Sequence, residues 1–281
     1  FMKKLNVILD TDVYNQVDDI FAIFYLLANE KFFNLNAITI APYKVKHQPD
    51  VSISEGIKLS YLEANKILNI ANRNYPVICG ADEFVSKDKK QNLATNFIIE
   101  QCNKNDFTYI IAIGALTNIA LALEQAPEII EKAKVLWLGT SNLFESFFDT
   151  NFLEEPKAFE IVLNSGVDLT IVPTTASRCM RVSYAELKER LQESNIKTYL
   201  LETARNFCKF EGNGKSIILH DVLPIQVLNH FEDFHIQKVS KKVFPKNIAV
   251  KENGTLEYVA ELDPCLAVNH FFNEVNNFIK G

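Results

Sequence analysis

The sequence predicts an α/β protein with an open, mostly parallel, Rossmann-like sheet and helices on both faces. Short apolar runs typical of buried strands alternate along the chain with longer segments of helical period. Parallel strands are covered by helices on both faces, so they take the form of continuous apolar runs. Apolar residues make up 48% of the 281 residues, which is enough for a large core.

Each expected element follows from a local pattern. Residues 5–9 form the first apolar run, and residues 20–28 are too apolar for a solvated helix, so they indicate a buried one. Pro42 closes the second strand because proline cannot donate to a ladder. The expected strands cover residues 5–9, 37–41, 76–80, 109–113, 135–139 and 169–173, with 256–262 as an edge strand. The expected helices cover residues 20–28, 54–70, 92–102, 118–123, 182–191 and 199–210.

No linker, repeat or change of composition interrupts this alternation, so we expect residues 1–281 to form a single domain. The formal charge is −6 and the chain has no block of Lys or Arg, which argues against a nucleic-acid partner. The longest apolar run, 20–28, is about half the length needed to cross a bilayer, so no membrane partner is expected. The cysteines are five, widely spaced and without a CxxC pair. They predict free thiols in a reducing, cytoplasmic compartment.

Four aspartates lie within ten residues, directly after the first predicted strand: Asp10, Asp12, Asp18 and Asp19. Open α/β sheets bind ligands at the carboxyl ends of their strands. Carboxylates this close repel one another and raise one another's pKa unless a divalent cation neutralises them or one carboxylate stays protonated. The alternative is that Asp18 and Asp19 only complement the dipole of the following helix while Asp10 caps a turn. Turn chemistry uses one acid at a time, so four together favour a metal site.

Three further segments lie at predicted strand ends or in loops. Residues 114–118, Gly-Ala-Leu-Thr-Asn, separate the fourth predicted strand from a helix, and Thr117 is an N-cap candidate. Asp149 and Asn151 lie in a polar loop, and the pair at 220–221, His-Asp, precedes an apolar helical stretch. Taken singly, each segment has an ordinary structural explanation.

Together, the four segments resemble the calcium-dependent nucleoside hydrolases, which cut the N-glycosidic bond of ribonucleosides. The resemblance runs from Lys3 to about residue 270, and it is greatest to a divergent bacterial branch of the family. The matching motifs are Asp-x-Asp at 10–12, Asp-Asp at 18–19, Gly-x-Leu-Thr-Asn at 114–118, Asp149-x-Asn151 followed by Glu155-Pro156, and His-Asp at 220–221. The resemblance implies the nucleoside hydrolase fold.

The resemblance also implies a metal set. The family's calcium would be held by Asp12, Asp19, Asp221 and the main-chain carbonyl of Thr117. This donor set suits calcium, which takes roughly six to eight oxygen ligands from carboxylates, carbonyls and waters.

The substrate implied by the resemblance is a small riboside, cleaved to ribose and free base with a calcium-bound water as nucleophile. Asp12 would be the general base, and His220 would protonate or position the leaving base. The sugar would be bound by Asp18, Asp149, Asn151 and Asp221. The family further implies a role in purine or pyrimidine salvage and a homo-oligomer, a dimer or tetramer.

Two departures from the family pattern keep other interpretations open. The loop between Asp12 and Asp18 has five residues where most members have three, and Asp149 replaces a glutamate. One alternative is a phosphatase of the haloacid dehalogenase type, with Asp10 as nucleophile and magnesium as the metal, although the later motifs of that class are missing. The other is a non-catalytic relative that binds ribosides or calcium.

Overall fold

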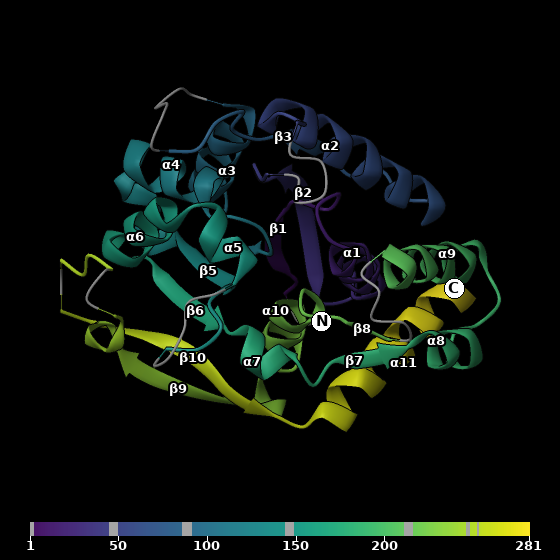
Figure 1. Cartoon of the computed structure of the whole chain (residues 1–281). Coiled ribbons are helices and arrows are strands. Elements are labelled where there is room, and N and C mark those ends of the chain that lie inside the picture. Colours follow the sequence, from purple (N-terminus) through teal and green to yellow (C-terminus); the bar gives the residue numbers. More distant parts are fainter. Residues whose placement is uncertain are drawn as a thin grey trace.

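The computed structural model describes residues 3–44, 50–85, 92–143, 149–210, 216–245, 248–251 and 253–281. Eight strands in this part of the chain form one sheet in the order β3-β2-β1-β4-β5-β6-β10-β9 (Figure 1). All neighbours are parallel except β9 and β10. The strands are β1 (Leu5–Thr11), β2 (Phe33–Ile40), β3 (Val77–Cys79), β4 (Thr108–Ala112), β5 (Ala133–Leu138), β6 (Asp168–Val172), β9 (Phe234–Ser240) and β10 (Thr255–Leu262). A separate antiparallel pair joins β7 (Arg181–Ser183) to β8 (Ser216–Ile218).

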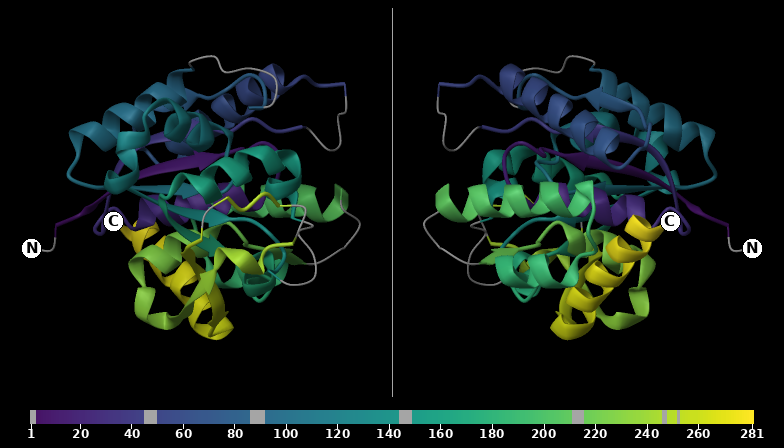
Figure 2. Two further views of the ribbon diagram at one scale, coloured as in Figure 1. Left: turned by 90° about the vertical axis from the view of Figure 1, so that its left-hand side faces the viewer. Right: turned by 90° about the vertical axis from the view of Figure 1, so that its right-hand side faces the viewer.

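The strands divide the apolar interior into two cores. Successive side chains of a strand point to opposite faces, and accordingly Val7 and Leu9 lie in one core and Ile8 in the other. The first core is completed by α1 (Asp18–Ala28), α2 (Ile53–Ile70), α10 (Val222–Asn229) and α11 (Pro264–Lys280). The second is completed by α3 (Leu93–Lys104), α4 (Thr117–Gln125) and α6 (Pro156–Ser165). Figure 2 shows α3 and α11 on opposite sides of the sheet, so the predicted fold class is confirmed.

Strand order fixes where a site can form. The chain moves outward from β1 through β2 to β3, then returns to place β4 on the other side of β1. Such a reversal opens a crevice at the carboxyl ends of the two central strands. The aspartates that follow β1 and the loop that follows β4 therefore lie at the same point of the sheet edge.

The sequence-based assignment differs from the structure in several places. β10 is not an edge strand, because β9 pairs with its outer side. Residues 182–191 are not one helix, because the chain first forms β7 and then α8 (Tyr184–Arg190), which begins in a capping box at Ser183. The helix α11 was not expected. The remaining helices are α5 (Thr150–Glu154), α7 (Thr174–Ser177) and α9 (Asn195–Phe210), with 3-10 turns η1 (Pro127–Lys132), η2 (Phe231–Asp233) and η3 (Lys241–Val243).

No helix in the described part of the chain combines the length and the apolar character that a membrane span requires.

Candidate functional site

Four buried aspartates from three segments form what we call the aspartate cluster: Asp12, Asp18, Asp19 and Asp221. Asp12 follows β1, Asp18 and Asp19 open α1, and Asp221 directly precedes α10. One carboxylate oxygen from each of Asp18, Asp19 and Asp221 lies within 4.8 Å of the others. Asp12 and Asp19 are near enough to repel electrostatically. The exposed fraction of each of the four residues is at most 4%.

Burial and mutual repulsion make the carboxylates of the cluster difficult to ionise. Burial, and then repulsion from Asp19, raises the pKa of Asp18 to about 7. Burial raises the pKa of Asp19 to about 6, although the Thr11 hydroxyl donates to it at 2.5 Å. The pKa values of Asp12 and Asp221 are raised well above the usual range by burial and by neighbouring carboxylates. A compact, buried, all-oxygen donor set of this kind fits a hard divalent cation.

Asp10 is not part of the cluster. Its Oδ1 accepts from the Thr39 hydroxyl at 2.5 Å and from the Asn118 side-chain amide at 2.9 Å. These bonds join the end of β1 to β2 and to the start of α4. Asp10 therefore supports the loop and does not line the cavity described next.

The aspartate cluster lines a cavity of about 160 Å³. Three further predicted residues, Asp149, Asn151 and His220, also line it, and we call them the second lining group. Asn151 donates from Nδ2 to the carbonyls of Ile113 at 2.9 Å and Leu138 at 3.0 Å, just beyond β4 and at the end of β5. Both amide hydrogens are then engaged, so its Oδ1 is left as an acceptor for a ligand.

Asp149 lies at the start of a helix that the sequence analysis treated as a loop. Its carboxylate accepts from the backbone N–H of Phe152 at 3.2 Å and caps α5. An aspartate suited to a helix N-cap was the available sequence signal for this helix. However, α5 has five residues, too few to show a helical period. This turn brings Asp149 and Asn151 to the cavity together.

His220 is held by a serine that the sequence analysis did not identify. The hydroxyl of Ser177, in α7, lies 2.6 Å from Nδ1 of His220. Burial, and then the positive charges of Arg178 and Arg181, lowers the pKa of His220 to about 4. The imidazole is therefore neutral near pH 7. When the Ser177 hydroxyl donates to Nδ1, Nε2–H is the donor left for a ligand.

A family model describing inosine-uridine preferring nucleoside hydrolases matches residues 7–261. The chain belongs to this family. The resemblance predicted from the motifs is thus confirmed.

Curated relatives agree with the family. Uridine nucleosidase 1 of Arabidopsis thaliana is 27% identical over 179 residues, covering 59% of this chain and 52% of that protein. Probable uridine nucleosidase 2 of the same plant is 24% identical over 263 residues, covering 81% and 78%. The chain matches between 34% and 52% of the length of the first four curated relatives.

Solved structures establish the same fold. A plant nucleoside hydrolase, the PpNRh1 enzyme, superposes with a TM-score of 0.81 at 17% identity, covering 98% of this chain and 99% of its own. A purine-preferring ribonucleoside hydrolase from Gardnerella vaginalis gives 0.76 at 18% identity, again covering 98% and 99%. The predicted nucleoside hydrolase fold is confirmed.

Thr117, the fourth metal ligand implied by the family, is placed differently from the other three. Its hydroxyl donates to Glu155 at 2.5 Å, and it is not among the described residues that line the cavity. The loop that leads into α4 nevertheless passes close to the cluster. A Cβ atom on Gly114 would lie 3.2 Å from Oδ1 of Asp12 and 2.9 Å from Cβ of Ala41, so the approach requires glycine there.

The five-residue loop that departs from the family pattern contributes to the site. Asn15 donates from Nδ2 to Oδ2 of Asp12 at 2.8 Å. Gln16 lines the cavity and donates to the Thr150 hydroxyl at 3.2 Å. The loop therefore orients Asp12 and connects the aspartate cluster to the helix that carries Asn151.

Proposed function

We propose that this protein hydrolyses the N-glycosidic bond of a ribonucleoside and releases ribose and the free base. The observation that carries the proposal is the aspartate cluster: four buried carboxylates meet in one cavity with the second lining group. The order of these residues along the chain resembles that of the nucleoside hydrolase family, whose model matches residues 7–261.

The metal we propose is Ca²⁺, held by Asp12, Asp19, Asp221 and the main-chain carbonyl of Thr117. Raised carboxylate pKa values and an all-oxygen donor set support it. Calcium, when bound, lowers the pKa of water and fixes vicinal sugar hydroxyls.

We assign the remaining steps of the reaction to side chains of the protein. Asp12, oriented by Asn15, takes the proton of the attacking water as general base. Asp18 accepts a hydrogen bond from a ribose hydroxyl. Cleavage passes through a state with positive charge on C1′ and the ring oxygen, which nearby carboxylates stabilise. Attack by water on the opposite face from the departing base inverts the configuration at C1′.

The second lining group holds the rest of the substrate. Asp149 and the Oδ1 of Asn151 accept hydrogen bonds from sugar hydroxyls. Asp221 binds the sugar as well as the metal. His220 donates from Nε2 to the leaving base. Because the pKa of His220 is lowered, its imidazole is neutral. This favours a role in positioning the leaving base over the donation of a proton from an imidazolium.

The two alternatives from the sequence gain no support. A haloacid dehalogenase-type phosphatase needs Asp10 as nucleophile, but Asp10 is fully buried between Thr39 and Asn118 and outside the cavity. A relative that binds ribosides or calcium without catalysis would not need a general base, and so would not need Asp12 to be oriented as it is.

The proposal is tested by incubating the calcium-loaded protein with inosine, guanosine, adenosine, uridine and cytidine and measuring released base by chromatography. Hydrolysis of at least one, abolished in Asp12→Asn, is the expected result. A melting temperature raised by a nucleoside that is never cleaved would show a binding protein instead. The 5′-monophosphates, included in the same panel, establish whether a phosphate is accepted.

We also retain a homo-oligomer and a cytoplasmic location as predictions. All five cysteines are free thiols, which supports a reducing compartment. Sedimentation velocity of the purified protein distinguishes a dimer or tetramer from a monomer.

A further inference from the structure

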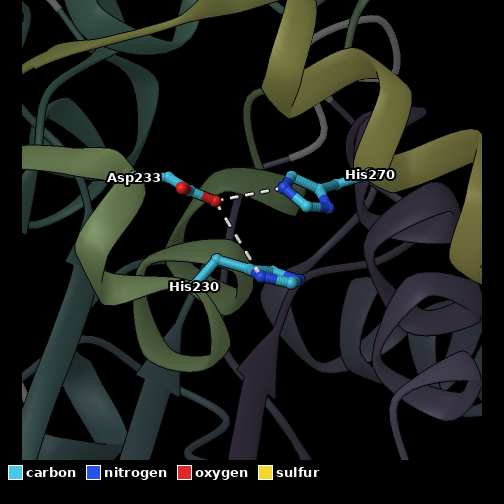
Figure 3. Close-up of side chains that lie close together, drawn as sticks. All are labelled: His230, Asp233 and His270. Atoms are coloured by element: carbon cyan, nitrogen blue, oxygen red, sulfur yellow. Dashed lines mark hydrogen bonds and ion pairs between the residues drawn. The ribbon is translucent and has the colours of Figure 1, made fainter.

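A second group of possible metal ligands lies away from the cavity. His230 follows α10, Asp233 ends η2, and His270 lies in α11 (Figure 3). Asp221 and His230 flank opposite ends of α10, whose eight residues span about 12 Å at 1.5 Å per residue. This histidine cluster (His230, Asp233 and His270) is therefore separate from the aspartate cluster.

The three side chains present their donor atoms to one point. Oδ2 of Asp233 lies 3.1 Å from Nε2 of His270 and 3.9 Å from Nδ1 of His230. The imidazole rings are stacked, with centroids 3.9 Å apart and planes inclined by 23°. The three ligand atoms all lie within 4.8 Å of one another. Ligands of a tetrahedral zinc ion at about 2.0–2.2 Å are roughly 3.4 Å apart, so small side-chain rotations suffice to bind one.

Hydrogen bonding alone, without a metal, explains the position of His270 beside Asp233 but not that of His230. His270 bonds to Asp233, whereas the 3.9 Å between Nδ1 of His230 and Asp233 is too long for a hydrogen bond. Nε2 of His230 is also buried with no hydrogen-bond partner in the described part of the chain. A buried imidazole nitrogen without a partner is costly. Nδ1, which faces Asp233 at 3.9 Å without a hydrogen bond, is the nitrogen that an ion between the three side chains would bind.

The surroundings suit a cation. Glu232 adds negative potential at His230, and Glu274, which lies one helical turn from His270 on α11, adds to it although it is paired with Lys31. The side chains of His230, Asp233 and His270 are 15%, 25% and 24% exposed, so water can reach the site and complete the coordination.

We propose that His230, Asp233 and His270 form a second metal site, selective for a first-row transition cation such as Zn²⁺. Imidazole nitrogen suits zinc, cobalt and nickel, whereas the all-oxygen aspartate cluster suits calcium. The ion joins the end of α10 to α11 and stabilises the packing of these two helices. The proposal does not depend on the proposed hydrolase activity.

Cobalt(II) is a suitable probe because its visible absorption reports nitrogen ligation in a site of low coordination number. The full chain is saturated with Ca²⁺ to fill the aspartate cluster, and Cys265→Ser removes the exposed thiol. We expect one equivalent of Co²⁺ to bind with visible bands and to be displaced by Zn²⁺. Affinity should fall by more than about 10-fold in His230→Gln and in His270→Gln, since about 10-fold is already lost when a residue that only orients a metal ligand is replaced.

The matched control is His235→Gln. His235 lies on β9, its side chain is 58% exposed, and its Nδ1 lies 4.0 Å from Glu261. Its replacement should leave Co²⁺ binding unchanged. Equal affinity in wild type and in both cluster variants, or no stoichiometric binding at all, would overturn the proposal.

Anomalous diffraction from wild-type crystals soaked in ZnCl₂ gives a test that needs no variant. A peak at the zinc edge between the three side chains supports the site, even if a variant fails to fold. Peaks elsewhere, with none at the cluster, contradict it.

Discussion

The aspartate cluster and the second lining group share one cavity but differ in how their polar atoms are satisfied. The aspartates repel one another and have raised pKa values, so they need a cation to ionise together. In the second group, Asn151 is tied to two carbonyls and His220 to Ser177. The difference supports the proposed division of roles, in which the first group supplies charge for the reaction and the second supplies shape and selectivity.

The largest effect is expected at Asp12. Asp12→Asn keeps the shape of the side chain but cannot accept a proton, so kcat should fall by at least about 10²-fold on every nucleoside. Steady-state kinetics of base release measures this. Asp10→Asn is the matched control, because Asp10 supports the loop from outside the cavity and its replacement should cost much less. Equal losses in the two variants would mean that the roles are wrongly assigned.

A smaller, substrate-dependent effect is expected at His220. His220→Ala removes a hydrogen bond to a leaving base that carries developing charge, so kcat on a natural nucleoside should fall roughly 10- to 100-fold. Nitrophenyl riboside should be cleaved at nearly the wild-type rate, since nitrophenolate departs without assistance. Ser177→Ala, which keeps the imidazole and removes its partner, should have an intermediate effect. If both substrates slowed alike, His220 would belong with the metal-binding residues.

Calcium should stabilise the fold, because it relieves repulsion within the aspartate cluster. At a hundredfold excess over its Kd, one ion adds about 2.7 kcal/mol to the free energy of unfolding, a rise of several degrees in Tm for a chain of this size. Differential scanning fluorimetry with calcium and with chelator measures it. Asp19→Asn should lose the rise. The account would be contradicted by identical melting curves for the wild type in the two conditions.

The smallest effect is a pH dependence of the metal-free protein. The folded-state pKa of Asp18 is about 7 and that of Asp19 about 6, against 3.8 for an ordinary aspartate. The folded state therefore binds more protons than the unfolded state between these values, and stability falls as pH rises from about 4 to 7. The Tm of the chelated protein should drop over this window, and Asp18→Asn should drop less. Added calcium should weaken or reverse the trend, because it binds the ionised carboxylates.

Short-range features of the sequence located Asp12, Asp18 and Asp19, whereas Asp221 was joined to them only through the family resemblance. A continuous apolar strand, a polar loop and an apolar helix place Asp12 and Asp19 at a sheet edge, as β1 and α1 show. The expected helix 54–70 is confirmed almost to the residue as α2, since Ser52 caps it and its apolar period is regular. Local pattern and tertiary structure agree in these segments.

Other features depend on contacts that no local pattern reveals. The residues of β9 are only partly buried, so its sequence shows a weak alternation of apolar and polar residues. Because β9 was not expected, β10 could not be recognised as an inner strand. Ser177 reaches His220 across 43 residues of sequence. The two histidines of the histidine cluster are 40 residues apart and meet only when α10 packs near α11.

The central claim is that the aspartate cluster performs metal-dependent hydrolysis of a riboside. The most direct measurement is the rate of base release by chelated protein as Ca²⁺ is added back, with bound calcium counted in the same samples. The account predicts negligible release without calcium, recovery that saturates at one ion per chain, and no recovery in Asp19→Asn. A rate unaffected by chelator, or recovery unchanged in Asp19→Asn, would contradict it.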